Sequence, residues 1–551
     1  MSSPARAAPG PDRLPQVVAS RPVLPAEPVA HPELVEFVLE QTRSPVDTWA
    51  VAATLESRGL RDVDARERYG KRDVFDLAGE VYAACRLRLR REDVAAVVED
   101  PQDLALRARR FLRFYLRGMF FAAPMAIQIG SVLLLGFGLW SFLYFDERQA
   151  TAVASGTLLA FVVTGGFVQA IGRLGLFYGE QESHVLAMRV CYRLIRIGLI
   201  FAGLVGLAWL LLSLASPQFP LPFVLVALVY YVLLSALWLF MAVLYTLQLR
   251  LAIVASSVVG LVVIAAVLAV APHIGIYVAH WIGMVASNAL AWACGHRVFK
   301  RRAAGVAGET ALAKLPRDAI LAYSVGPYFG YGVLYFGFLF VDRVIAWSAG
   351  EQQFLVVFRT PYELGLDWAL LSLILPVALL EYTINEFSAL IIPMQKRFSA
   401  LDLEAHNRWF QRFYRRQLAL LAGFVALSVV LVFNGVLALR HFQGSSQVRD
   451  FFANPITYEV YFLGALGYAL LVWGLMNGVF FFSLSRPFFV LRAIGAGLVA
   501  GIAVGFVLSR TVEYWLAAAG LVVGAAVFAA ITARYAARVL RELDYYYYSA
   551  Y

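Results

Sequence analysis

The amino-acid sequence predicts an all-α membrane protein that crosses the bilayer many times. Of its 551 residues, 61% are hydrophobic and only 15% are charged, whereas an average soluble domain is roughly 45–50% apolar and about 25% charged. The mean hydropathy is +0.69. Apolar runs of about 20 residues, the length that a helix needs to cross a ~30 Å hydrocarbon core, recur along most of the chain. Composition therefore places the chain among polytopic membrane proteins.

The region before the apolar runs has a different character. Residues 1–32 are rich in proline and lack the apolar core of a secretory signal, so we expect a disordered tail in the cytosol. Residues 33–116 predict a small soluble helical domain, with helices at 46–57 and 74–91. The charge-dense stretch 60–70 is interpreted as a solvated helix face or, alternatively, as a docking surface for a cytosolic partner. No nucleotide-binding loop, metal-ligand cluster or nucleophile motif occurs in this region, and we do not expect an enzyme.

About twelve membrane spans are predicted from residue 118 onward. Apolar runs place them near 118–145, 150–171, 197–215, 223–247, 251–271, 274–293, 320–347, 362–389, 418–438, 456–484, 488–508 and 515–533. A basic linker at 297–319 divides them into two halves, 117–296 and 320–541, and a short tail follows at 542–551. Because each half has an even number of spans, the halves share an orientation and are interpreted as parallel repeats.

The positions of the basic residues predict the orientation. Arginine and lysine gather in loops that share one side of the membrane if both termini are cytosolic, whereas an opposite loop such as 216–222 is poor in charge. This placement also explains the net charge of +10, so we expect the lipid bilayer of the cytoplasmic membrane as partner and no nucleic acid. Cys85, Cys191 and Cys294 are too few and too scattered for a disulfide framework or a metal site, and we expect no cofactor.

Ionisable residues in the seventh and eighth spans mark the candidate site. An isolated charge at the bilayer centre costs roughly 2.5–3.5 kcal/mol, so such side chains are expected to pair or to line a hydrated pathway. These spans contain Asp342, Arg343, Glu363, Asp367 and Glu381. Asn385 follows Glu381 by one helical turn and therefore shares its face. We interpret all six as candidates for a substrate pathway or for coupling.

The turn between these two spans predicts a specific contact. If it centres near residue 354, Arg343 lies at the same depth as Glu363 and Asp367, and we predict that it contacts one of these carboxylates. Glu381 is deeper and has no obvious basic partner at its level, so we predict that it faces a hydrated cavity between the halves. Alternatively, Asp342 and Arg343 form a simple pair near the outer interface.

Aromatic residues are interleaved with glycines in the seventh span. Tyr331 and Tyr335 belong to this group, and Gly330, Gly332 and Gly337 lie among them. Aromatic faces beside bendable backbone suit a pathway for sugar rings. They equally suit close helix packing through small residues, and both interpretations stay open.

The topology and a short motif resemble a known superfamily. Two six-span halves, no ATPase motif and long basic amphipathic connectors at 172–196 and 393–417 resemble the multidrug/oligosaccharidyl-lipid/polysaccharide (MOP) flippase superfamily. The run Phe340-Val341-Asp342-Arg343-Val344-Ile345-Ala346-Trp347, followed by the acidic eighth span and an aromatic, basic connector, is similar to the PelG-like exporter subunit of Pel exopolysaccharide systems. The resemblance covers about 118–541 and leaves the role of the N-terminal region open.

The resemblance implies export of a sugar polymer or a lipid-linked glycan across the cytoplasmic membrane, beside a cytosolic glycosyltransferase or synthase subunit. A secondary transporter for a small molecule also fits the topology, although a long connector replaces the short Gly-Asp-Arg-type turn of such transporters. A third hypothesis is a non-transporting scaffold that anchors a polysaccharide synthase. None of the three is an enzyme.

Overall fold

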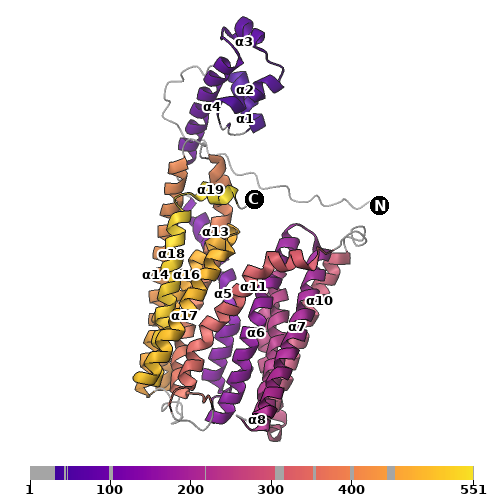
Figure 1. Ribbon diagram of the computed structural model, residues 1–551, viewed down its shortest axis with the longest axis vertical. Coiled ribbons are helices and arrows are strands. Elements are labelled where there is room, and N and C mark those ends of the chain that lie inside the picture. Colours follow the sequence, from indigo (N-terminus) through magenta and orange to yellow (C-terminus); the bar gives the residue numbers. More distant parts are fainter. Residues whose placement is uncertain are drawn as a thin grey trace, which may run out of the picture. The chain divides into compact units, whose positions relative to one another are not determined.

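A computed structural model of the protein contains helices and connecting segments (Figure 1). It describes residues 31–42, 45, 47–97, 103–216, 219–304, 315–350, 355–397, 403–442 and 453–549. Within these residues no β-strand occurs, and a single isolated bridge joins Phe137 and Phe142. The predicted all-α class is therefore confirmed. Most of the predicted N-terminal tail, residues 1–30, lies outside the described residues.

Internal contacts divide the chain into two compact units. The first comprises Met1–Glu99 with Lys396–Asp402, and the second comprises Asp100–Gln395 with Leu403–Tyr551. We call them the N-terminal unit and the membrane unit. Helix α5 begins at Asp103. The division at Glu99 therefore precedes the predicted start of the membrane part at residue 117, because the first membrane helix begins well before its apolar run.

The N-terminal unit contains four helices in its described residues. They are α1 (Pro32–Thr42), α2 (Thr48–Ser57), α3 (Asp62–Tyr69) and α4 (Val74–Val97). The Asp47 side chain accepts a hydrogen bond from the Ala50 backbone N–H at 2.8 Å, which caps α2. This cap explains why α2 begins two residues after its predicted start. Leu34, Leu55, Leu77 and Cys85 belong to the apolar core that the helices share.

The charge-dense stretch forms α3. Ala65 is its one buried residue, so most of its charged side chains face solvent, as the solvated-face interpretation predicts. Gly70 ends the helix in the left-handed region, with φ of 64°. The docking alternative stays a prediction.

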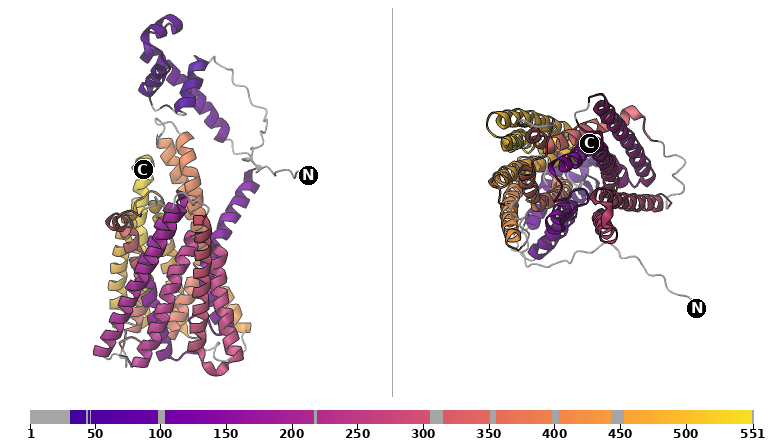
Figure 2. Two further views of the ribbon diagram at one scale, coloured as in Figure 1. Left: turned by 90° about the vertical axis from the view of Figure 1, so that its right-hand side faces the viewer. Right: turned by 90° about the horizontal axis from the view of Figure 1, so that it is seen from below.

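The membrane unit contains the remaining helices, which run side by side (Figures 1 and 2). The first half contains α5 (Asp103–Leu135), α6 (Glu147–Glu180), α7 (His184–Ala215), α8 (Leu221–Thr246), α9 (Arg250–Val270) and α10 (Ile276–Ala304). The second half contains α11 (Asp318–Trp347), α12 (Thr360–Leu371), α13 (Ile374–Arg397), α14 (Leu403–Phe442), α16 (Pro455–Ser483), α17 (Pro487–Thr511), α18 (Ala517–Val539) and the short α19 (Leu543–Tyr548). We call the end at which α7 begins and α10 ends the basic end, because Arg301 and Arg302 lie there. The opposite end is the far end.

Among the described residues, ten helices are long and apolar enough to cross a membrane, and the bent pair Ala108–Phe120 and Ala122–Leu135 would make an eleventh. Helix α10 occupies the predicted sixth span, but it is less apolar than the others because it contains polar residues such as His280 and Asn288. The predicted architecture of about twelve spans therefore corresponds to ten or eleven described helices that are long and apolar enough to span a membrane, together with α10.

Proline residues break two of the predicted spans. The halves of α5 meet at an angle of 55°, and Pro124 lies just after the bend, where its missing N–H leaves the Phe120 carbonyl without its helical partner. This span ends at Leu135 and not near 145. Pro376 acts similarly, because α12 ends at Leu371 and α13 begins at Ile374.

The two predicted amphipathic connectors are not separate helices. Helix α6 continues to Glu180 and α7 begins at His184, so residues 172–196 mostly extend two membrane helices. Their apolar faces pack on each other through Leu174, Tyr178 and Val190, which explains the extension. In the second connector, the described aromatic residues belong to α14, and the Tyr414 hydroxyl donates to Asn477 Oδ1 at 2.8 Å. Residues 398–402 lie outside the described residues.

The halves have separate cores, and the most extensive contact between them is that of α6 with α11. Two apolar clusters lie almost wholly in the first half and a larger one mainly in the second. Helix α6 packs directly on α11, where Gly165 and Gly332 bring the two backbones together. A Cβ atom at Gly332 would overlap the Gly165 carbonyl. Glycine is therefore required for this close approach.

Candidate functional site

A cavity of about 510 Å³ lies between the two halves. Its walls come from α5, α6, α8 and α9 on one side and from α11, α12 and the beginning of α13 on the other. Aromatic side chains dominate the walls: Trp140, Phe142, Phe145, Phe161, Trp238, Tyr335, Phe336, Phe340, Trp347, Phe358 and Trp368. The Phe161 ring from the first half stacks on Phe336 and Phe340 from the second, with centroids 5.6 and 5.3 Å apart. The cavity therefore presents flat apolar faces from both halves.

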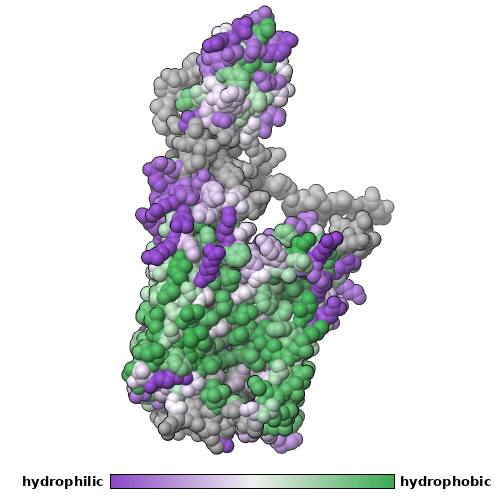
Figure 3. Space-filling view, in the orientation of Figure 1, coloured by the Kyte–Doolittle hydropathy of each residue, from purple (hydrophilic) through white to green (hydrophobic). Residues whose placement is uncertain are grey.

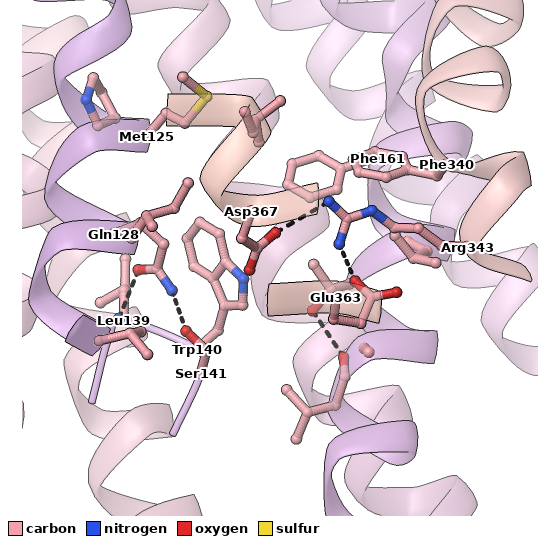
Figure 4. Close-up of a pocket in the computed structure, with 18 of the residues that line it drawn as sticks. Met125, Gln128, Leu139, Trp140, Ser141, Phe161, Phe340, Arg343, Glu363 and Asp367 are labelled. Carbon is pink, nitrogen blue, oxygen red and sulfur yellow. Dashed lines mark hydrogen bonds and ion pairs between the residues drawn. The ribbon is translucent and has the colours of Figure 1, made fainter. Parts of the chain in front are cut away.

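Three charged side chains lie together in the cavity wall (Figure 4). The Arg343 guanidinium forms an ion pair with Glu363, and its Nη2 lies 3.1 Å from Asp367 Oδ1. The Trp347 indole N–H donates to the other Glu363 oxygen at 2.7 Å. The Arg343 and Glu363 side chains are only 8% and 5% exposed, whereas Asp367 is 43% exposed. Asp367 is thus the charged group that an occupant of the cavity meets.

Helix geometry explains this arrangement. Arg343 and Trp347 are four residues apart and share a face of α11, and Glu363 and Asp367 share a face of α12 in the same way. Both faces point to the cavity near the far end, where the two helices are joined. A planar guanidinium can bind two carboxylates at once, which offsets part of the desolvation of all three groups.

Asp342 belongs to a neighbouring buried cluster outside the cavity wall. This residue is 2% exposed, and its Oδ2 accepts a hydrogen bond of 2.8 Å from the Tyr362 hydroxyl. Asp342 and Arg343, adjacent on α11, therefore point to different partners. The alternative of a simple Asp342–Arg343 pair at the interface is not what the structure contains.

A short hairpin at 136–145 lines the cavity towards the far end. Gly138 N–H donates to the Ser141 carbonyl at 2.7 Å, and Leu143 N–H donates to the Gly136 carbonyl at 2.9 Å. The Gln128 amide on α5 holds the hairpin by donating to Ser141 Oγ at 2.6 Å and accepting from Leu139 N–H at 2.8 Å (Figure 4). One glutamine thus fixes the position of several wall residues.

The predicted site residues divide into two groups. Arg343, Glu363, Asp367 and Tyr335 line the cavity, and the predicted contact between Arg343 and a carboxylate is confirmed, since Arg343 binds both. The others are not among the cavity-lining residues: Glu381, Asn385, Asp342 and Tyr331. Tyr331 is buried against Phe482, with ring centroids 5.0 Å apart, so its contact supports the packing interpretation.

The expectation for Glu381 was wrong in one respect. Its Oε1 lies 3.9 Å from Arg250 Nη2, so it has a basic partner at its level. Arg250 begins α9, a helix far away in the sequence, and the sequence alone did not indicate that the two elements meet. Asn385 donates to the Glu381 carbonyl at 2.7 Å and to its Oε1 at 3.4 Å, which confirms that these two residues share a face.

Sequence reasoning missed most of the aromatic wall. Phe336 and Phe340 lie one turn apart on the same face of α11 as Arg343, and this spacing was a usable signal. Gln128, Trp140 and Trp238 come from the first half and carried no comparable signal, because only tertiary packing brings them to the cavity. Among the described residues, no group of three His, Cys, Asp or Glu side chains is placed to hold a metal ion.

The fold is that of the MATE transporters, which are members of the MOP superfamily. A crystal structure of a single-residue mutant of the Vibrio cholerae MATE transporter VcmN has a TM-score of 0.50 and 15% sequence identity and covers 80% of this chain and 98% of that chain. A crystal structure of a MATE in complex with MaD5 has a TM-score of 0.50 and 12% identity and covers 79% of this chain and 96% of that chain. No protein-family model and no curated protein matches the sequence significantly. The narrower resemblance to PelG-like exporters stays a prediction.

Proposed function

We propose that this protein is a membrane transporter that exports a ring-containing solute, in the first place a glycan segment, through the cavity between its halves. The observation that supports this proposal best is the pairing of flat aromatic walls with a few hydrogen-bonding side chains, Gln128, Ser141 and Asp367, in one cavity. Sugar rings offer an apolar face for stacking and hydroxyl groups for such partners. Two halves with separate cores that meet around the cavity suit alternating access.

The charges in the cavity limit the solute. Among the described lining residues, Arg343 is basic and Glu363 and Asp367 are acidic, so the wall has one net negative charge when all three are ionised. Arg343 is already bound to both carboxylates and is not available to an anionic group. A neutral or cationic solute therefore fits the cavity better than a glycan whose pyrophosphate linkage would have to enter it.

A small amphipathic molecule is the second candidate. The cavity volume of about 510 Å³ lies within the roughly 300–1,000 Å³ of ordinary small-molecule sites. A long polymer would need to pass through in extended form, whereas a single amphipathic cation would fill this volume and place its charge at Asp367. The partially exposed Asp367 carboxylate favours this candidate most directly.

Binding to the purified full-length protein in nanodiscs tests the proposal. Four tryptophans line the cavity, Trp140, Trp238, Trp347 and Trp368, so their fluorescence reports on its occupancy. The probes are a neutral oligosaccharide, tetraphenylphosphonium and an isoprenyl pyrophosphate-linked sugar. We expect saturable quenching by the first or the second and at least tenfold weaker binding of the third.

The variants Asp367→Asn and Trp140→Leu test whether the solute binds in the cavity. We expect Asp367→Asn to weaken the cation by about tenfold and the neutral saccharide much less, because only the charge changes. Glu386→Gln, on α13 and outside the cavity wall, is the matched control. Binding that neither variant changes would exclude the cavity, and preference for the saccharide or the cation decides between the two candidates.

A further inference from the structure

The cavity wall ends at the same level on three helices. Towards the basic end, the last lining residues are Ala122 on α5, Met241 on α8 and Val377 on α13. Four residues further on each helix, one turn beyond, come Gly118, Tyr245 and Glu381. A layer of other residues therefore separates the cavity from the basic end of the membrane unit.

An ion pair between the two halves lies in this layer. Arg250 Nη2 at the start of α9 lies 3.9 Å from Glu381 Oε1 on α13, and the two side chains are 21% and 18% exposed. Arg250 also donates to Gln248 Oε1 at 2.5 Å, which holds its guanidinium near the beginning of α9. Asn385 contacts Glu381 from the next turn of α13. Both charges are thus held in place by a neighbour on their own side of the interface.

Direct backbone packing completes the layer. A Cβ atom added to Gly118 would lie 2.7 Å from Ala378 Cα and 2.9 Å from Glu381 Cβ, both closer than normal contact. Helices α5 and α13 therefore touch without side chains between them at the level of the ion pair. Water cannot pass between two backbones at this distance, so the contact closes this part of the interface as long as the halves stay together.

We propose that the Arg250–Glu381 ion pair is a latch between the halves, which closes the cavity at the basic end and must separate before the cavity opens there. The pair joins the first half to the second and lies outside the wall: Glu381 is one turn beyond Val377 on α13, and Arg250 is about two turns beyond Ser257 on α9. A mostly buried pair is disrupted at a substantial cost when one partner is lost, whereas separation of the halves rehydrates both charges. The two charges are thus stabilised in two arrangements: paired with each other when the halves are together, and hydrated when the halves are apart. A two-state element requires two such arrangements.

The proposal rests on the proposed function for its role in transport, but its test needs no solute. Ser257 on α9 lines the cavity and is 6% exposed, so a cysteine there reports on access. The full-length Ser257→Cys chain, with Cys294 replaced by alanine, is treated in membrane fragments with a small cationic methanethiosulfonate reagent applied to both faces. The rate of labelling is compared between this parent chain and variants that lack the Arg250–Glu381 ion pair.

We expect Arg250→Gln and Glu381→Gln each to raise the labelling rate at least tenfold, because either change removes the pair. The double swap Arg250→Glu with Glu381→Arg should return the rate to within about twofold of the parent. Glu386→Gln, which removes a charge from the same helix five residues away, should leave the rate unchanged. Thermal unfolding of each purified variant in detergent shows whether faster labelling reflects opening or general loss of structure.

Equal labelling rates in the parent and in both single variants would overturn the latch, as would a double swap that labels as fast as the single variants. If one single variant does not fold, the other and the swap give the same comparison. Loss of solute binding with a normal latch response would reject the proposed function alone. Normal solute binding without a latch response would reject the latch alone.

Discussion

Arg343 determines the stability of the charged cluster in the second half. It is 8% exposed on its side chain and holds Glu363, which is still more deeply buried, while the Trp347 indole satisfies the second Glu363 oxygen. A buried carboxylate keeps its charge only with such partners. The members of this cluster therefore depend on one another. Removal of one leaves the desolvation cost of the remaining buried groups uncompensated.

We predict that Arg343→Leu lowers the free energy of unfolding by about 3–5 kcal/mol, because it strands the Glu363 carboxylate. The double variant Arg343→Leu with Glu363→Leu should recover much of this loss, since the stranded Glu363 carboxylate is then removed as well. Thermal unfolding of the purified variants in detergent measures both effects. A single variant as stable as the parent, or a double variant less stable than the single one, would contradict this explanation.

The only described cysteine of the N-terminal unit is expected to be inert. Cys85 is completely buried, and burial raises the pKa of its thiol to about 11, although nearby Arg88 opposes the shift. The reactive species is the thiolate, which is then only about a thousandth of the population at pH 8 and becomes substantial only as the pH approaches the pKa.

We therefore predict that Cys85 in the full-length chain, with Cys191 and Cys294 replaced by alanine, resists maleimide at pH 8 until the protein is denatured. Leu87→Cys, placed on the same helix at a position that is 55% exposed, is the control and should react within minutes. Mass spectrometry of the intact protein counts the added groups. Rapid reaction of Cys85 under native conditions would show that the core of this unit is open.

Residues whose partners are near in the sequence could be predicted, and those with distant partners could not. The contact of Arg343 with Glu363 and Asp367 followed from equal distances to one turn, which is a local argument. The partner of Glu381 lies on α9, and no local pattern connects it with α13. A charge without a visible partner was therefore interpreted as hydrated, although packing of the two halves supplies one.

At the scale of elements, glycines and prolines decide where helices bend and where they touch. Apolar periodicity located nearly every membrane helix, and the seventh span agrees closely with α11 (Asp318–Trp347). It did not reveal the breaks near Pro124 and Pro376, because the apolar run continues through them. The hairpin at 136–145 was missed for the same reason: its sequence, mostly aromatic and aliphatic, continues the apolar run of the helix before it.

The crossing of α6 and α11 tests directly whether glycine is required where two helices touch. A side chain at Gly332 would overlap the Gly165 backbone, whereas a Cβ atom at Gly337 on the same helix would meet only Leu498 Cδ2, at the ordinary distance of 3.9 Å. We predict that Gly332→Ala lowers the free energy of unfolding by roughly 1–3 kcal/mol through overpacking, despite the better helix propensity of alanine. Gly337→Ala should be neutral or slightly stabilising. Equal unfolding temperatures for the two variants would show that the crossing is loose.

At the scale of the whole membrane unit, hydrophobicity and charge are distributed as a bilayer requires. On the face shown in Figure 3, a hydrophobic band extends across the membrane unit, and hydrophilic side chains gather beyond it. Ten or eleven of the described helices are long and apolar enough to cross a membrane. The basic residues at the end of α10 define one end of the unit, and the positive-inside rule relates that end to the cytosol.

We predict from this asymmetry that the basic end faces the cytosol. Gln181 lies between α6 and α7 at the basic end, and His273 lies between α9 and α10 at the far end, and both are exposed. In a chain with Cys294 replaced by alanine, Gln181→Cys should react with a membrane-impermeant maleimide only in inside-out vesicles, and His273→Cys only in right-side-out vesicles. The reverse pattern would invert the orientation and, with it, the direction of transport that the latch controls. Labelling of both cysteines from one side would contradict the alternation of the helices between them, because an odd number of spans, α7, α8 and α9, separates the two positions.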